Sequence, residues 1–245
     1  MRFTKMQGAG NDFIIIDNRE QTIPEDKLPE LAKRLCTRRL SIGADGLMVM
    51  ERAQGAADFR MGFYNSDGSV GEMCGNGARC ISRYGYEHGL SQGDTVTVET
   101  TAGVVTGTRV TERMYTVRLN DPTKINLHHP VAASGQTWDC DYVELGNPAI
   151  PHAVVVEKNW QSIPEPELRE ICRTIRFCPD FPKGANVTFC RLMGEDHLVA
   201  RTFERGVEDF TLACGTGCGA TVTALTLRGL VSGKNVRVSM PGGDL

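Results

Sequence analysis

Two short stretches decide the fold, Cys74-Gly75-Asn76-Gly77 and Cys214-Gly215-Thr216-Gly217, and they lie 140 residues apart. Further matches follow in the same order at the same offset, among them Gly89-Leu90 with Gly229-Leu230. Several matches in one order are hard to obtain by chance, and such internal repetition decides an architecture. The sequence therefore predicts two homologous halves.

Both halves have the same predicted order of a strand, a turn, C-G-x-G, a helix and further strands. In the first half, F-R-M-G-F-Y-N-S-D-G-S-V at 59–70 begins as an alternating strand and continues into a turn at Asn65 to Gly68. Gly89 and Gly229 are expected to end the two helices as C-cap glycines. In the second half, C-G-A-T-V-T-A-L at 218–225 is nearly all small and apolar, which predicts a helix buried on every side.

These patterns predict an α+β fold with α/β-type halves. It would comprise two pseudo-symmetric homologous domains, each a mixed sheet wrapped around a central helix. We place the division near Asp121-Pro122, so that the N-terminal half is 1–120 and the C-terminal half is 121–245. The cleft between two such halves is the expected position of an active site.

The two copies differ in length after the glycine turn that follows the helix. The first copy continues through Val104 to Asn120, whereas the second stops at Leu245. We therefore expect the C-terminal half to lack its last strands.

The composition excludes several classes of protein. The 245 residues are 40% hydrophobic and 23% charged, as is typical of globular proteins. A net charge of −3 argues against a nucleic-acid partner, which requires a basic excess. No apolar run approaches the roughly 20 residues of a membrane span, and the N-terminus has no apolar signal-peptide core. A cytoplasmic protein with no membrane partner is expected.

Nine cysteines are a high count, and without an export signal disulfides are not the expected reason for them. The chain has no C-x-x-C pair, and its five histidines do not fall into ligand spacing with the cysteines, so no metal is predicted. Most of the cysteines are expected to be small core residues, namely Cys36, Cys80, Cys140, Cys172, Cys178, Cys190 and Cys218.

Cys74 and Cys214 differ because each stands directly before a helix. A helix N-terminus presents unbonded N–H groups and about half a positive charge, which bind a carboxylate and lower a thiol pKa. The N–H groups of Gly75-Asn76 and Gly215-Thr216 would hold the carboxylate of an α-amino acid. One sulfur would remove the α-proton as general base, and the other would return a proton to the opposite face as general acid. This inversion requires no cofactor.

The paired arrangement also sets the protonation states. Two thiolates about 7 Å apart would repel by about 2–2.5 kcal/mol at an effective dielectric constant of about 20, so the first ionisation suppresses the second. A single C-G-x-G before a helix is more often a tight turn with a buried cysteine. Its duplication at equivalent positions favours catalysis, because packing offers no reason for it.

Seven motifs along the chain together resemble the diaminopimelate epimerase family: KMQGAGNDF at 5–13, GADGL at 43–47, NSDGS at 65–69, CGNGARC at 74–80, GAN at 184–186, ERG at 204–206 and ACGTG at 213–217. The resemblance implies two similar domains with the active site between them, interconversion of LL- and meso-diaminopimelate in lysine and peptidoglycan precursor synthesis without pyridoxal phosphate, and a homodimer. It implies that Cys74 and Cys214 are the acid/base residues. The substrate contacts it implies are Asn11, Asn65, Asn147, Asn186, Glu204 and Arg205.

The chemistry of these contacts suits the second amino-acid head group of diaminopimelate. Arg205 can bind the distal carboxylate through two N–H groups, with asparagines as neutral donors. Glu204 can accept from the distal ammonium group. One motif departs from the family, which usually reads G-N-P-H where this chain reads G-N-P-A-I-P-H at 146–152. His152 is therefore a possible site residue whose register is open.

Two other functions stay open at this point. A racemase of another amino acid, such as histidine, would share the cysteines but lack groups for a distal carboxylate. A thiol redox protein would use Cys74 and Cys214 as a regulatory disulfide. Activity on LL-diaminopimelate but not on L-histidine separates the first, and loss of α-proton exchange in a cysteine variant separates the second.

Overall fold

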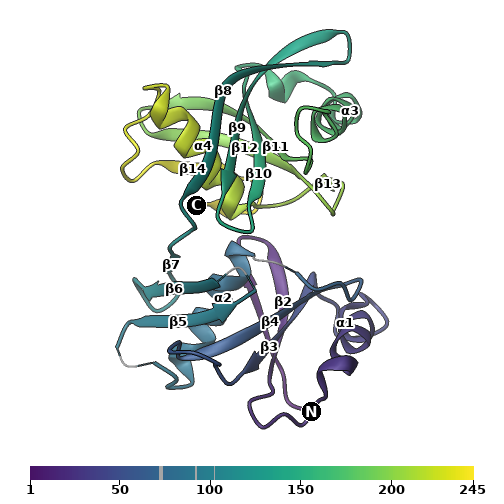
Figure 1. Cartoon of the computed structure of the whole chain (residues 1–245), viewed down its shortest axis with the longest axis vertical. Helices are drawn as coiled ribbons and strands as arrows, with labels where there is room; N and C mark the ends of the chain where they lie inside the picture. Colours follow the sequence, from purple (N-terminus) through teal and green to yellow (C-terminus); the bar gives the residue numbers. More distant parts are fainter. Residues whose placement is uncertain (72–73, 92, 102) are drawn as a thin grey trace. The chain divides into compact units, whose positions relative to one another are not determined.

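The structure is a computed structural model that describes residues 1–71, 74–91, 93–101 and 103–245 (Figure 1). The chain divides into two compact units, Met1–Arg118 and Leu119–Leu245. The first unit contains β1 (Thr4–Gly8), β2 (Asn11–Asp17), α1 (Leu28–Cys36), β3 (Gly46–Glu51), β4 (Phe59–Asn65), α2 (Gly75–Glu87), β5 (Thr95–Thr100), β6 (Gly103–Arg109) and β7 (Tyr115–Val117). The second contains β8 (Pro122–Ala133), β9 (Gln136–Leu145), β10 (Ile150–Val156), α3 (Glu165–Arg176), β11 (Asn186–Gly194), β12 (His197–Glu204), β13 (Asp209–Phe210), α4 (Gly215–Leu227), β14 (Arg237–Met240) and β15 (Gly243–Asp244).

Each unit has one mixed sheet, and the two sheets share a topology. The first has the order β1-β2-β3-β4-β5-β6-β7, and the second has β15-β14-β12-β11-β10-β9-β8 with β13 on β12. From β1 to β6 the pairings alternate antiparallel, parallel, antiparallel, parallel, antiparallel, and the same sequence runs from β9 through β10, β11, β12 and β14 to β15. The predicted α+β class with a mixed sheet in each half is confirmed.

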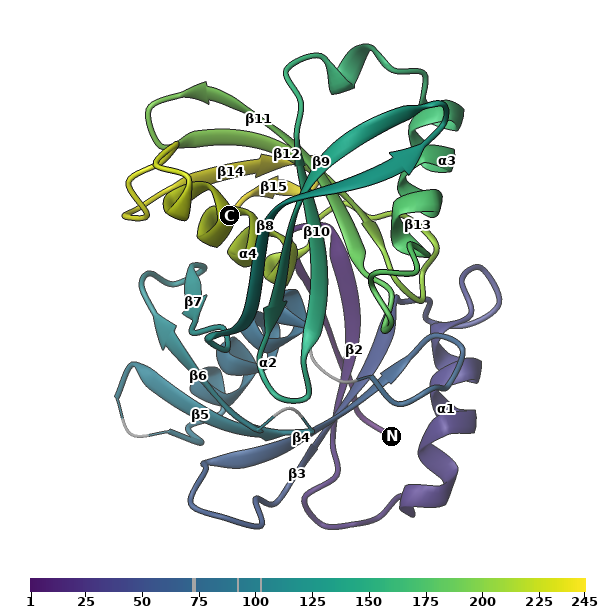
Figure 2. The ribbon, with the colours of Figure 1, turned by 45° about the horizontal axis from the view of Figure 1, so that its top comes forward.

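In the first unit, α1 and α2 cover opposite faces of the sheet (Figures 1 and 2). Phe13 and Ile15 of β2 pack in the cluster that contains Ile81 of α2, whereas Ile14 and Ile16 pack in the cluster that contains Leu28 and Ala32 of α1. A strand buried on both faces is an uninterrupted apolar run rather than an alternating one, which explains the sequence F-I-I-I. Each such side chain contributes roughly 1.5–3 kcal/mol through burial.

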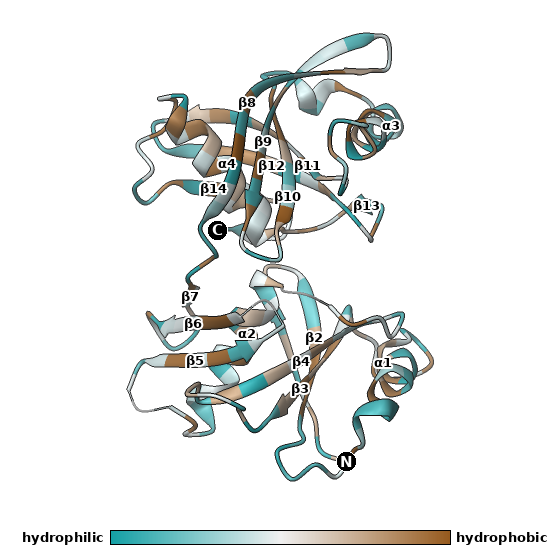
Figure 3. Ribbon diagram, viewed as in Figure 1, coloured by the Kyte–Doolittle hydropathy of each residue, from teal (hydrophilic) through white to brown (hydrophobic). Residues whose placement is uncertain are grey.

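The second unit repeats this layering. Ala153 and Val155 of β10 face α3, where Ile171 and Ile175 join the same cluster. The other face of the sheet packs against α4, and Val154 of β10 is fully buried. Figure 3 shows both polar and apolar colours on α1 and α3, as expected of helices with one face in the core and one in solvent.

The glycines predicted to end the central helices do so in the same way in both units. Gly89 and Gly229 have φ of +66° and +69°, the left-handed region that favours glycine. The N–H group of each following residue donates to the carbonyl five positions back, Leu90 to Gly85 and Leu230 to Leu225, each at 2.9 Å. This pair of Schellman ends confirms the prediction.

The prediction that α4 is buried on every side is correct for one face only. Ala220, Ala224 and Leu225 are fully buried, but Val222 and Thr223 are half-buried, and Leu227 at the end of the helix is 57% exposed. An apolar composition does not by itself determine whether each face of a helix packs against another element. Among the described residues, no helix has the length and apolar content that a membrane crossing needs.

Candidate active site

Both central helices begin at a cysteine, and the two helix starts have the same geometry. Cys74 is the N-cap of α2 with φ −125° and ψ 114°, and its sulfur accepts the Gly77 N–H at 3.4 Å. Cys214 is the N-cap of α4 with φ −130° and ψ 104°, and its sulfur accepts the Gly217 N–H at 3.3 Å. In both helices the thiol takes the place that a serine or aspartate oxygen normally occupies at an N-cap.

In the second unit Cys214 is 6% exposed, and its surroundings oppose ionisation. Burial raises the pKa of the Cys214 thiol well above its ordinary value, and the negative charge of Glu204 raises it further. The Thr216 hydroxyl, 3.6 Å away, and the Gly217 N–H act in the opposite direction but do not balance burial. The expectation that the helix terminus lowers the pKa is wrong for Cys214, because desolvation of the charged form outweighs the dipole here.

Glu204, the last residue of β12, forms a pair with this thiol. Burial raises the pKa of its carboxyl group, against hydrogen bonds from Thr211 and from the Cys214 thiol. The Thr211 hydroxyl donates to Glu204 Oε1 at 2.6 Å. A buried thiol and an adjacent half-buried carboxyl group, both with raised pKa values, can pass one proton between them.

Arg205, Asn186 and His152 lie at the same end of the second sheet. The Asn186 side-chain oxygen accepts a hydrogen bond from the Arg205 backbone N–H at 2.8 Å, and the Asn186 side-chain nitrogen donates to the Pro151 carbonyl at 3.3 Å. The Arg205 guanidinium donates to the Lys183 carbonyl at 3.1 Å. His152 stands opposite Asn186 in the β10–β11 pair and is fully buried.

Neither ring nitrogen of His152 has a hydrogen-bond partner within the described part of the chain. Burial, and then the positive charge of Arg205, lower the pKa of His152 to about 3, so the ring is neutral at physiological pH. Buried polar atoms normally have partners, and exceptions concentrate at functional sites.

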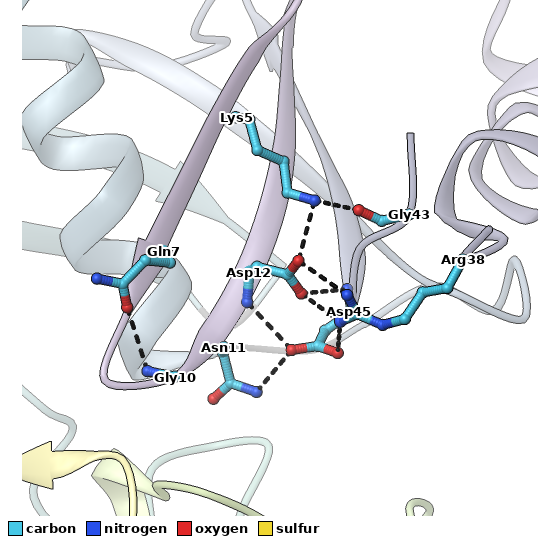
Figure 4. A network of polar contacts seen from close by, with 8 residues as sticks. All are labelled: Lys5, Gln7, Gly10, Asn11, Asp12, Arg38, Gly43 and Asp45. Atoms are coloured by element: carbon cyan, nitrogen blue, oxygen red, sulfur yellow. Dashed lines mark hydrogen bonds and ion pairs between the residues drawn. The ribbon is translucent and has the colours of Figure 1, made fainter. Parts of the chain in front are cut away.

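In the first unit a polar network fixes Asn11 (Figure 4). The Asn11 side chain donates to Asp45 Oδ2 at 3.2 Å, and its oxygen accepts from the Asn76 carboxamide in the first turn of α2. Arg38 bridges Asp12 and Asp45, with contacts of 2.5 and 2.8 Å. Burial opposes ionisation of Asp12, but hydrogen bonds from Arg38 and Lys5 outweigh it and lower its pKa to about 2.

Asn65 ends β4 at this same edge of the sheet, opposite Gly46. Its side chain donates to the Ser69 hydroxyl at 2.9 Å, and Gly68 donates to its carbonyl at 2.9 Å, which closes the predicted turn. Asn147 is exposed in the turn between β9 and β10, and it contacts none of the other candidates by a hydrogen bond that the structure describes. In α4, the Cys218 N–H donates to the carbonyl of the N-cap residue Cys214 at 2.9 Å, and Gly215 and Thr216 lie before Cys218 in the first turn.

The structure thus gathers most of the predicted residues into two groups, one within each unit. The α2 group comprises Cys74, Gly75, Asn76, Asn11 and Asn65. The α4 group comprises Cys214, Gly215, Thr216, Glu204, Arg205, Asn186 and His152. The structure also adds residues that the sequence did not indicate: Asp45 and Arg38 in the first unit, and Thr211 and Met240 in the second. The Met240 sulfur accepts the Cys214 backbone N–H at 3.4 Å. The only sequence signal for Asp45 is its place in G-A-D-G-L.

Two pockets of about 490 and 500 Å³ lie elsewhere, beside α3 and beside α1, and contain none of the predicted site residues. Among the described residues, one group of three side chains could hold a metal ion, and it shares no member with either group: His129, Cys178 and Asp180.

The sequence comparisons with known proteins agree on one family. The sequence pattern of diaminopimelate epimerase matches residues 3–125 and 142–245. The diaminopimelate epimerase of Leptospira biflexa is 36% identical over 263 aligned residues, covering 100% of this chain and 90% of that protein. The enzyme of Aquifex aeolicus is 38% identical over 256 aligned residues, covering 100% and 88%.

Solved structures share the fold at lower identity. A probable proline racemase from Agrobacterium radiobacter has a TM-score of 0.69 at 18% identity, with 99% of this chain and 82% of that chain covered. A hydroxyproline epimerase from Agrobacterium vitis has a TM-score of 0.62 at 19% identity, with 94% and 77% covered.

Proposed function

The chain belongs to the diaminopimelate epimerase family, and from this we propose that it interconverts LL- and meso-2,6-diaminopimelate with Cys74 and Cys214 as the two acid/base residues. The observation that carries the two-cysteine assignment is the matching N-cap. Two units of one topology each begin their central helix at a cysteine whose sulfur accepts the N–H of the glycine three residues on. Packing gives no reason for that coincidence, whereas a reaction that needs an acid and a base on opposite faces of one carbon does.

The surroundings of Cys214 suggest how its proton is handled. With its pKa raised, Cys214 rests as a thiol and is ready to donate a proton to the α-carbon. For the reverse reaction the thiol must first lose its proton, and Glu204 accepts its hydrogen bond. The carboxyl group would take that proton while the sulfur attacks the substrate α-proton. Cys74 would act in the complementary role on the other face.

The substrate carboxylate at the reacting end would be bound by the N–H groups of Gly215 and Thr216, in the positive field of the α4 N-terminus. Charge that develops on this carboxylate when the α-proton leaves would be stabilised by the same dipole. Gly75 and Asn76 are the corresponding residues in the first turn of α2. This arrangement supplies the electrostatic stabilisation from backbone groups that do not reorganise during the reaction.

The distal amino-acid group would be bound by Arg205, Asn65, Asn147 and Asn186, and Asn11 would contact the substrate. Glu204, which the sequence assigned to the distal ammonium group, is assigned here to the Cys214 thiol because it accepts the hydrogen bond of that thiol. The Asn186 oxygen is already engaged by the Arg205 N–H, so Asn186 would offer its remaining amide hydrogen to a substrate carboxylate. Arg205→Lys would retain the charge but lose the two-point geometry that a guanidinium gives a carboxylate. We expect this variant to raise the KM for diaminopimelate, and unchanged turnover would contradict the assignment.

We further infer a cytoplasmic enzyme that acts as a homodimer, without nucleic-acid or membrane partners. The membership of the chain in the diaminopimelate epimerase family supports this proposal. Light scattering of the purified chain would test the dimer.

The decisive experiment measures α-proton exchange. LL-diaminopimelate is incubated with the enzyme in deuterated water, and deuterium at the α-carbon is followed together with formation of the meso isomer. Cys74→Ala and Cys214→Ala should each abolish epimerisation. The matched control is Cys80→Ala, which removes a buried thiol of α2 whose pKa burial raises to about 12. Full epimerisation by either of the first two variants would refute the two-cysteine assignment.

A further inference from the structure

A second group of reactive side chains lies in the second unit, apart from the residues assigned to epimerisation. One ligand atom from each of His129, Cys178 and Asp180 lies within 4.8 Å of the other two. His129 belongs to β8, and Cys178 and Asp180 belong to the segment between α3 and β11. His129 Nε2 and Asp180 Oδ2 are 3.0 Å apart.

We propose that His129, Cys178 and Asp180 form a zinc site. An imidazole nitrogen, a thiolate and a carboxylate oxygen are the three ligand types that Zn²⁺ binds in proteins, and this mixture does not suit Ca²⁺ or Mg²⁺. Tetrahedral zinc with bonds of about 2.0–2.3 Å places two ligand atoms roughly 3.3–3.5 Å apart. The His129–Asp180 contact is already close to that distance, and Cys178 needs to approach by little more than 1 Å at most.

The segment that carries two of the ligands is held in place by its own backbone. The N–H group of Cys178 donates to the Ile175 carbonyl at 3.1 Å, and Phe181 donates to the Cys178 carbonyl at 2.9 Å. Gly184 then donates to the Phe181 carbonyl at 2.6 Å. Two ligands two residues apart on a hydrogen-bonded segment lose little conformational freedom when they bind an ion.

The third ligand, His129, is directed towards this segment by an irregularity in β8. The β8–β9 register shifts between Asn126 and His129, and His128 within the shift has φ +58°. β-Bulges of this kind redirect a side chain locally. His129 also packs on Phe181, with ring centroids 5.3 Å apart, and His129 Nδ1 lies 3.3 Å from the Asn126 carboxamide. Zinc on Nε2 requires the proton on Nδ1, and a metal-bound histidine normally donates that proton to an acceptor. The Asn126 carboxamide, whose nitrogen faces Nδ1 in the structure, would turn its oxygen towards Nδ1 to accept it.

Space for a fourth ligand adjoins the group. The pocket of about 490 Å³ beside α3 is lined by Cys178 and Asp180, together with Glu170 and Arg173 of α3. Three protein ligands leave one tetrahedral position, which water from this pocket can fill. The site would tie β8 to the segment between α3 and β11 within one unit.

Cobalt substitution tests the proposal on the whole chain. The purified, reduced protein is titrated with Co²⁺, which reports four-coordinate geometry and thiolate ligation through its absorption bands, and Zn²⁺ is then used to displace it. We expect one equivalent of Co²⁺ with a sulfur charge-transfer band. His129→Ala and Cys178→Ser should weaken Zn²⁺ binding at least as much as the roughly 10–100-fold that loss of an outer-shell partner costs. Asp180→Asn is also expected to weaken Zn²⁺ binding, and because Asp180 is exposed this substitution does not disturb the core.

The matched control is His128→Asn, which removes the neighbouring histidine that pairs with Asp139 at 2.9 Å outside the group. Zn²⁺ should raise the unfolding temperature of the parent protein and of this control, but not that of His129→Ala. Absence of the sulfur band in the parent protein would overturn the proposal. So would a band that survives Cys178→Ser and disappears with Cys74→Ala or Cys214→Ala, because the ion would then belong to the epimerase cysteines.

Discussion

Gly217→Ala is expected to separate stability from catalysis, because the added methyl group meets the Cys214 side chain. An ideal Cβ at Gly217 would lie 3.2 Å from Cys214 Sγ, 3.2 Å from Cys214 Cβ and 3.0 Å from Thr202 Oγ1. Ordinary contacts are about 3.5–4.0 Å, so the sulfur must move by roughly 0.3–0.8 Å. Since a misplacement of about 1 Å can cost roughly 100-fold in rate, we expect kcat to fall about tenfold, or about 1.4 kcal/mol in activation free energy.

The matched control is Gly219→Ala, two residues further along the same helix. Its Cβ would meet only the flexible end of Leu119, at 2.7 Å from Cδ1, and a more distant Leu145 methyl. Replacing glycine by alanine inside a helix stabilises it by up to about 1 kcal/mol. Gly219→Ala should therefore unfold at equal or higher urea concentration with unchanged kcat. The steric strain at Gly217 should offset the same helix-propensity gain.

The assay is deuterium incorporation at the substrate α-carbon at saturating LL-diaminopimelate, with urea unfolding measured on the same preparations. In the first unit, Gly77→Ala offers a further comparison, since its Cβ would meet the flexible end of Met48 at 2.5 Å and leave Cys74 Cβ at 3.5 Å. We expect a smaller loss of kcat there. If Gly217→Ala turns over as fast as Gly219→Ala, the position of the Cys214 sulfur does not control the reaction, and the reasoning fails.

Three further outcomes are expected. Glu204→Gln removes the negative charge that raises the pKa of Cys214, so alkylation of this thiol should begin at lower pH; a shift to higher pH would contradict the pairing. Because the pKa of His152 falls from about 6.5 unfolded to about 3 folded, the unfolded chain binds the extra proton between these values, and stability should drop by about 1.4 kcal/mol per pH unit as pH falls from 6 to 4.5. His152→Phe should flatten that slope in urea titrations, and an unchanged slope would place its cause elsewhere. Asp45→Ala removes one of the two side-chain hydrogen bonds that hold the Asn11 carboxamide, the other being that from Asn76, and should raise KM for diaminopimelate several-fold with a smaller effect on kcat, whereas an equal loss in both would mean general misfolding.

The sequence alone determined the features that depend on local or periodic patterns. The repeated C-G-x-G placed a cysteine at the start of each central helix, and Gly89 and Gly229 placed the ends, because caps and left-handed turns depend on a few adjacent residues. The uninterrupted apolar runs in β2 and β10 are typical of strands that are covered on both faces, and such a run can be seen in the sequence itself. The order of motifs was also sufficient to identify the family.

Tertiary structure decided whatever depends on burial or on residues distant in sequence. The helix start alone predicted a lowered pKa for Cys214, yet its burial beside Glu204 reverses the direction, and desolvation cannot be counted from a motif. The hold of Asp45 on Asn11 arises from the parallel register of β2 and β3, which brings together residues 34 positions apart. His129 and Cys178 have no ligand spacing along the chain, and only the folding of β8 against the segment after α3 brings their ligand atoms within 4.8 Å.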